Sequence, residues 1–154
     1  MSDTISKEQL IQSFADAYEK SIAVAIAAAQ RGVTHRREAW GPRETIAHLA
    51  GWEVMASVRI PAVTSGALAA GKPPFEFADE DQQDLMNDAI NTMIVTMIGD
   101  QPLDTLCGML RQAYQHSVEL LKKLDNKFFQ PGEYVYERTK DAIEHCQEHN
   151  DQLT

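Results

Sequence analysis

The sequence predicts an all-α protein, a four-helix bundle with a long crossover connection and one shorter extra helical piece. Apolar residues recur with the 3.6-residue period of an α-helix along most of the chain. No segment alternates apolar and polar residues as a half-buried strand does, and no internal repeat indicates a solenoid. With 154 residues, the chain 1–154 is expected to form a single domain around one core.

The first helix is expected to begin after Ser6 and to end near Gly32. Ser6 and Gln9 have the spacing of a capping box, in which each side chain bonds the other residue's backbone N–H. The residues that follow the helical period are Leu10, Phe14, Ala17, Tyr18, Ser21, Ala25 and Ala28.

A second helix is expected from Pro42 to about residue 65. Gly41 is an acceptable N-cap, Pro42 suits the first helical position, and Glu44 complements the positive end of the helix dipole. The apolar stripe contains Ile46, Leu49, Trp52 and Met55. Pro61 should kink or end the helix, because proline removes a backbone hydrogen bond and clashes with the preceding turn.

The stretch GALAAGKPPFEFADED, residues 66–81, is rich in glycine and proline and is expected to be the long crossover. Further helices are expected at about 79–99, 102–124 and 135–152, with a break at DNKFFQPGEY. Trp40, Trp52 and the methionines of the 79–99 helix are expected to fill the core, because large apolar side chains at helical spacing usually do so.

Composition excludes several classes of partner. The 23 acidic and 14 basic residues give a net charge of −9, which disfavours binding to nucleic acid. No apolar run is long enough to span a membrane, and MSDTISKEQL lacks the features of a secretion signal, so a cytoplasmic protein is expected. Cys107 and Cys146 are too few for a disulfide framework and are expected to be reduced thiols.

Three of the five histidines are expected to face the interior. His48 lies on the stripe with Leu49 and Trp52, and His145 and His149 lie four residues apart on the last helix. Imidazoles at this spacing can bind one ion, and a third from a facing helix would complete a three-histidine site with an open position.

The competing interpretation is that these are hydrogen-bonded core histidines, since the H-x-x-x-H spacing also occurs by chance. The zinc-protease motif is absent, because Cys146 stands where that motif requires glutamate. Cys146 itself is expected to be a core residue, since adjacent helical residues point about 100° apart. His35 and His116 are assigned no role.

Two segments, WGPRETIAHLAGWE and DAIEHCQEHNDQL, resemble the signature segments of the DinB-like superfamily of small four-helix-bundle proteins. The first resembles the family's W-x-x-x-E-x-x-x-H-L pattern and the second its terminal H-x-x-x-H, while the asparagine of LMNDAI resembles one common after the crossover. The resemblance covers nearly the whole chain. It implies that His48, His145 and His149 bind a divalent metal, usually zinc or nickel.

Related proteins include thiol-dependent S-transferases and isomerases that use low-molecular-weight thiols, some hydrolases, and proteins that protect against a genotoxic metabolite. The resemblance therefore implies a small-molecule substrate or ligand. A metal held by three histidines could lower the pKa of a bound water or thiol for attack on a small electrophile. Glu44 and Glu148 are candidate partners that would orient the imidazoles.

Two other functions stay open at the level of the sequence. The first is a non-catalytic stress-response protein with the same bundle, which sequesters a ligand without turnover. The second is a structural homodimer whose histidines are merely buried. The sequence identifies neither the substrate, the metal nor the oligomeric state.

Overall fold

The structure, a computed structural model, describes residues 5–36, 39–68 and 79–154. These residues form five α-helices and one 3₁₀ helix: α1 (Lys7–Gln30), α2 (Pro42–Thr64), α3 (Glu80–Ile98), α4 (Leu103–Lys123), η1 (Asn126–Phe129) and α5 (Tyr134–Leu153). The prediction of an all-α fold is confirmed. None of the helices in these ranges is both long and apolar enough to span a bilayer.

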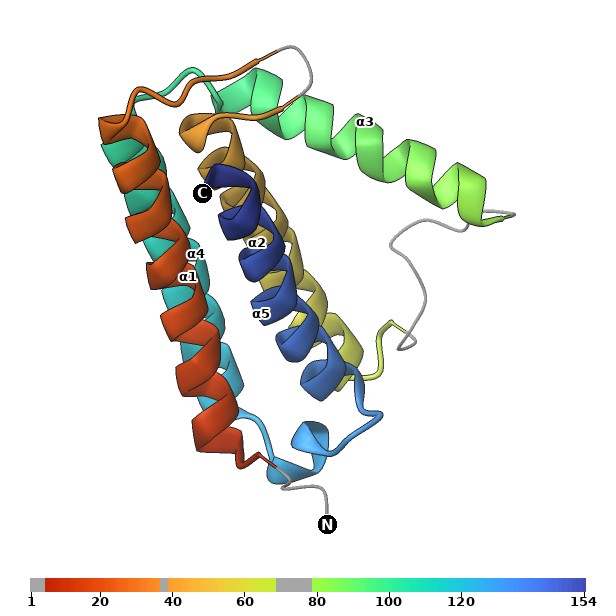
Figure 1. Cartoon of the computed structure of the whole chain (residues 1–154). Coiled ribbons are helices and arrows are strands. Elements are labelled where there is room, and N and C mark those ends of the chain that lie inside the picture. Colours follow the sequence, from red (N-terminus) through yellow and green to blue (C-terminus); the bar gives the residue numbers. More distant parts are fainter. Residues whose placement is uncertain (1–4, 37–38, 69–78) are drawn as a thin grey trace.

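Four of the helices form the bundle, and α3 leaves it at an angle (Figure 1). α1 and α5 run in one direction and α2 and α4 in the other, with α2 packed mainly on α4 and α1 mainly on α5 (Figure 1). α3 packs on α2 and returns the chain to the end of the bundle where α4 begins. Residues 69–78, which belong to the expected crossover, lie outside the described residues.

The predicted start of α1 is confirmed in detail. Ser6 Oγ accepts a hydrogen bond from the backbone N–H of Gln9 at 3.1 Å, and Gln9 Oε1 accepts one from the backbone N–H of Ser6 at 2.9 Å. Gly32 follows the helix with a φ of +81°, a conformation that favours glycine.

The start of α2 is also as predicted, with Gly41 as N-cap and Pro42 in the first turn. A Cβ on Gly41 would lie 2.6 Å from the backbone nitrogen of His35, so only glycine allows this close passage of the preceding loop. The predicted end near residue 65 is confirmed, since α2 continues past Pro61 to Thr64, so of the two effects expected of Pro61 it does not end the helix there. Pro61 lies so near the C-terminal end that it removes only one late hydrogen bond.

α3 differs most from the expectation. At 19 residues it is the shortest of the five α-helices that the structure describes, and its only buried side chains are Ile90 and Ile94. The expected core placement of its apolar residues is wrong in part, since Leu85, Met93 and Met97 are 72%, 51% and 70% exposed. The reason is that, among the described residues, α3 packs on the bundle mainly along α2, so burial involves one narrow face of the helix.

Candidate metal centre

His48 lies two turns into α2, where the helix is buried on all sides. The seven consecutive residues from Glu44 to Ala50 are all buried, because this part of α2 packs against the other helices of the bundle. His48 is 4% exposed and points toward α5.

His145 and His149 lie on successive turns of α5 and meet His48 through the same ring atom. The Nε2 of His145 is 3.1 Å from the Nε2 of His48 and 2.9 Å from the Nε2 of His149. The candidate ligand atoms of all three residues lie within 4.8 Å of one another. The structure therefore brings together the three histidines that the sequence singled out.

The donor set fits a divalent metal. A neutral imidazole nitrogen carries either a proton or a lone pair, and one shared proton cannot satisfy three converging nitrogens. Zinc–nitrogen bonds of about 2.0–2.1 Å would place two ligand nitrogens of one tetrahedral site roughly 3.3–3.4 Å apart. The observed separations of 2.9 and 3.1 Å are only slightly shorter, so a small outward movement of the rings would admit an ion.

All three imidazoles are held in the neutral form that binds metals. Burial, followed by the neighbouring His149 and His145, lowers the pKa of His48 to about 3, while the nearby Asn91 side chain opposes the shift. Burial is also the main cause that lowers the pKa of His145 and of His149. No proton therefore has to be displaced from these rings near neutral pH.

Indole rings enclose the cluster. The ring centroid of Trp40 lies 4.8 Å from that of His48 and 6.1 Å from that of His149. Trp52 approaches His48 edge-on at 6.5 Å and donates its Nε1–H to Oδ1 of Asn91 at 2.6 Å. The expectation that both tryptophans belong to the core is wrong in part, because they are half-buried and pack against the site.

The partners of the remaining ring nitrogens differ. Nδ1 of His149 lies 3.1 Å from Oε1 of Gln152, which orients the ring so that Nε2 faces the cluster. Nδ1 of His48 is buried and makes no hydrogen bond to any residue that the structure describes. The sequence did not single out Gln152, although its position three residues after His149 on one helix is a signal that could have done so.

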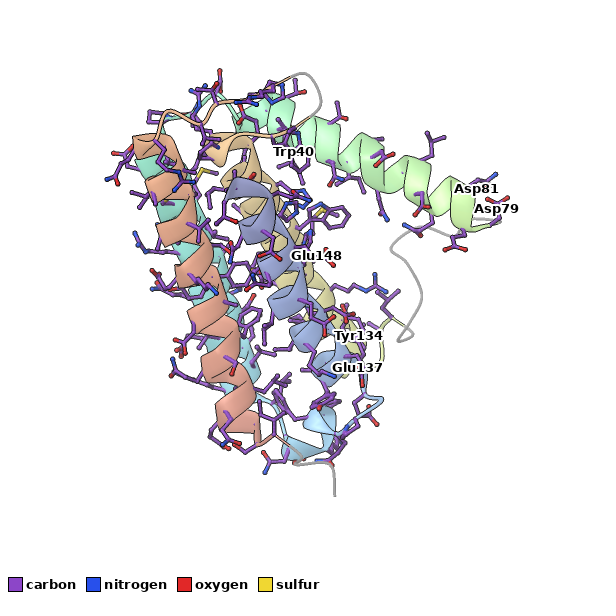
Figure 2. All side chains as sticks on the ribbon, in the orientation of Figure 1. Trp40, Asp79, Asp81, Tyr134, Glu137 and Glu148 are labelled. Atoms are coloured by element: carbon purple, nitrogen blue, oxygen red, sulfur yellow. The ribbon has the colours of Figure 1, made fainter. Side chains whose placement is uncertain are left out.

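The two proposed acidic partners do not contact the imidazoles as expected. No carboxylate of the described residues joins the three ligand atoms. Glu44 is buried near the start of α2, and Glu148 is an exposed residue of α5 that only opposes the lowered pKa of His145 and His149 by its charge (Figure 2). The sequence could not distinguish these positions from ones that touch the rings.

No family model, curated protein or solved structure matches this chain.

The two cysteines lie in the core, as predicted for Cys146, and the two remaining histidines lie outside the cluster. Cys146 belongs to the hydrophobic core although it directly follows His145, and both cysteines are free and buried. His35 and His116 are exposed and lie outside the cluster.

A cavity of about 1080 Å³ extends from His145 between α2, α3 and α5. Its walls are mostly apolar and include Leu49, Trp52, Met55, Met86, Ile90 and Ala142. Of the three histidines, His145 lines the cavity. The other two, His48 and His149, are covered by the ring of Trp40. The volume is typical of a pocket for a small organic molecule.

The cavity also contains a buried carboxylate that the sequence analysis missed. Glu53 is 1% exposed and accepts hydrogen bonds from the hydroxyls of Tyr18 and Ser117 and from Nη2 of Arg138. Its position in the apolar stripe of α2, four residues after Leu49, was the only sequence signal. Because all its partners come from other helices, that signal does not reveal them.

Proposed function

We propose that this chain is a DinB-like, divalent-metal-dependent enzyme that acts on a small electrophilic molecule, as a hydrolase or a thiol S-transferase. The observation that carries the proposal is the convergence of three neutral Nε2 atoms beside an apolar cavity. The family assignment is supported by the resemblance of WGPRETIAHLAGWE and DAIEHCQEHNDQL to its signature segments. Zinc or nickel suits three imidazole ligands.

The residues of the site have distinct parts in this proposal. His48, His145 and His149 hold the metal, and Gln152 keeps the ring of His149 in register. When bound, a divalent metal supplies Lewis acidity that lowers the pKa of a water or thiol ligand. Trp40 packs on the rings of His48 and His149 and does not line the cavity, so a substrate would approach past His145.

The second candidate is a stress-response protein that sequesters its ligand without turnover. It is favoured by the lack of any carboxylate beside the three imidazoles in the described part of the chain, since a general base is then missing. The same cavity would serve to bind the ligand.

Metal analysis tests the site itself. The purified protein should contain about one divalent ion per chain, as one three-histidine site requires. His145→Ala and His149→Ala should lower the metal affinity by more than the roughly 10–100-fold that loss of an outer partner costs. His116→Ala is the matched control, because His116 is exposed and lies outside the cluster. Equal metal content in all three variants would eliminate the proposed ligands.

A panel of electrophiles distinguishes the enzyme from the binder. Metal-loaded protein would be incubated with epoxides, activated alkyl halides and strained-ring compounds, each with and without a bacterial low-molecular-weight thiol. Turnover that needs the thiol and disappears in His48→Ala supports S-transfer, and thiol-independent turnover supports hydrolysis. If wild type and His48→Ala show no difference in turnover while a panel compound still raises the melting temperature, sequestration replaces catalysis.

A further inference from the structure

Two arginines line the cavity at a distance from the histidines. Arg59 belongs to α2 and Arg138 to α5. Arg138 Nη2 pairs with Glu53, but its Nη1 is buried without a hydrogen-bond partner. Nε of Arg59 is likewise buried and unpartnered, and the contact that the described structure gives its guanidinium is the ring of Tyr134 at 5.4 Å.

Buried cationic N–H groups without acceptors are unusual in native proteins, because each has lost its hydration without gaining a hydrogen bond. Two such groups in the wall of one cavity indicate that a bound ligand supplies the missing hydrogen-bond acceptors. Guanidinium groups present N–H pairs in a planar fork that matches the two oxygens of a carboxylate.

We propose that Arg59 and Arg138 bind the carboxylate of an elongated and otherwise apolar organic acid, the far end of which reaches His145. What happens at the histidine end rests on the proposed function, whereas the anion site depends on the arginines alone. The apolar part of the acid would lie against Trp52, Met55, Met86 and Ile90.

The charges favour a single negative charge on the ligand. Glu53 already neutralises Arg138, and no carboxylate of the described residues forms an ion pair with Arg59. One net positive charge therefore remains in this part of the cavity. Asp141 also lines the cavity but is exposed, so water screens its charge. A carboxylate balances this charge better than a phosphate dianion does.

The helix geometry sets the length of the ligand. Arg138, Ala142 and His145 all line the cavity from one face of α5. Seven residues at 1.5 Å per residue separate the Cα atoms of Arg138 and His145 by about 10 Å along the helix axis. In Figure 2, Trp40 lies toward one end of the bundle and Tyr134 toward the other. Trp40 packs on His48 and His149, and Arg59 lies over the ring of Tyr134. The ligand therefore needs a spacer of similar length between its carboxylate and its reacting end.

Calorimetry with 6-phenylhexanoate, and with 6-phenylhexanol as its neutral analogue, tests the anion site on the full chain. Both zinc-loaded and chelator-treated protein are used, so that a carboxylate bound to the metal is recognised. We expect the acid to bind at least about tenfold more tightly than the alcohol in both samples. A tenfold difference corresponds to the lower end of the free energy that a hydrogen bond to a charged group contributes.

Arg59→Gln should remove this preference, and Arg59→Lys should retain part of it. Arg59 makes no hydrogen bond within the described residues, so its replacement should leave the fold intact, which circular dichroism would verify. Arg111→Gln is the matched control, because this exposed arginine of α4 pairs with Glu19 outside the cavity and should keep the preference.

Two results would overturn the anion site, whatever the metal content. One is equal affinity of wild type for the acid and the alcohol, and the other is unchanged preference in Arg59→Gln. The proposed function fails separately: a protein that prefers the acid through Arg59 but takes up no metal keeps the anion site and loses the metal-dependent enzyme.

Discussion

His48, Tyr18 and Cys146 are ionisable side chains near the centre of the bundle, and the pKa of each is shifted in the direction that favours the neutral side chain. The pKa of His48 is lowered to about 3, that of Cys146 is raised to about 12, and that of Tyr18 is raised well above its usual value. Burial is the largest cause in each case, because it penalises the charged form. The charged groups beside these three side chains are Glu53 and Arg138, which form an ion pair.

The raised pKa of Cys146 makes stability depend on alkaline pH. Unfolding returns the thiol to its ordinary pKa of 9.0. Between pH 9 and about 12 the thiol is therefore ionised in the unfolded chain but still protonated in the folded chain. The contribution of the protonated thiol to the free energy of unfolding is fully present below pH 9. It is lost as pH rises toward 12, at no more than about 1.4 kcal/mol per pH unit.

Urea unfolding of wild type and Cys146→Ser at steps from pH 7 to 11 measures this contribution. The wild type should lose free energy of unfolding more steeply than the variant above pH 9, because serine does not titrate there. Parallel curves would show that the thiol is not protected by the fold. Tyr18 and the other tyrosines titrate in both proteins, so the difference between the curves isolates Cys146.

Sequence reasoning reached the histidines of the site but not their surroundings. His145 and His149 are four residues apart on one helix, and His48 lies on an apolar stripe, so their inward placement follows from periodicity. Trp40 covers the rings from a loop, and no periodicity governs a loop. Whether Glu44, Glu148 or Glu53 becomes buried and bonded depends on which other helices supply donors, and a single sequence does not contain that arrangement.

At the scale of elements, the junction of α2 with α3 depends on one glycine. A Cβ on Gly51 would lie 2.6–2.8 Å from three side-chain atoms of Ile94, closer than real contacts allow. Gly51 therefore permits α3 to approach α2, and Ile94 is one of the two buried side chains that attach α3. Residues near this junction, Trp52 of α2 and Ile90 of α3, line the cavity.

Gly51→Ala should destabilise the protein by about 1–3 kcal/mol, because an added methyl group overpacks a site that is already full. Gly108→Ala is the matched control, since a Cβ there meets nothing within 4 Å in the middle of α4. That control should instead stabilise by roughly 0.5–1 kcal/mol through helix propensity. Urea unfolding measures both, and a stabilising Gly51→Ala would contradict the close packing of α3.

Helix boundaries were predicted to within about two residues, because caps and periodicity are local. The orientation of α3 was not predictable in the same way. Its apolar residues spread over more than one face, and in the part of the chain that the structure describes the face with buried side chains packs mainly on α2. Which face that is depends on how α3 docks on α2, so the sequence predicted the existence of α3 but not the exposure of Met93 and Met97.

At the scale of the whole molecule, one carboxylate joins the four helices of the bundle. Glu53 extends from α2 and accepts hydrogen bonds from Tyr18 of α1, Ser117 of α4 and Arg138 of α5. A buried ion pair of this kind adds little net stability over an apolar pair, but loss of one partner leaves an uncompensated charge. It also fixes the register of the helices, because only one arrangement satisfies all three donors.

Glu53→Gln should therefore destabilise the fold by about 3–5 kcal/mol, since Arg138 loses its counter-charge while it stays buried. For a chain of this size, that corresponds to a fall in melting temperature on the order of 10 °C. The double variant Glu53→Gln with Arg138→Met removes both charges and should recover at least about 2 kcal/mol relative to Glu53→Gln alone. A single variant within about 0.5 kcal/mol of wild type would mean that Arg138 reaches solvent. In that case the cavity would lose its buried charge, and the anion site proposed at Arg59 would have to bind without Arg138.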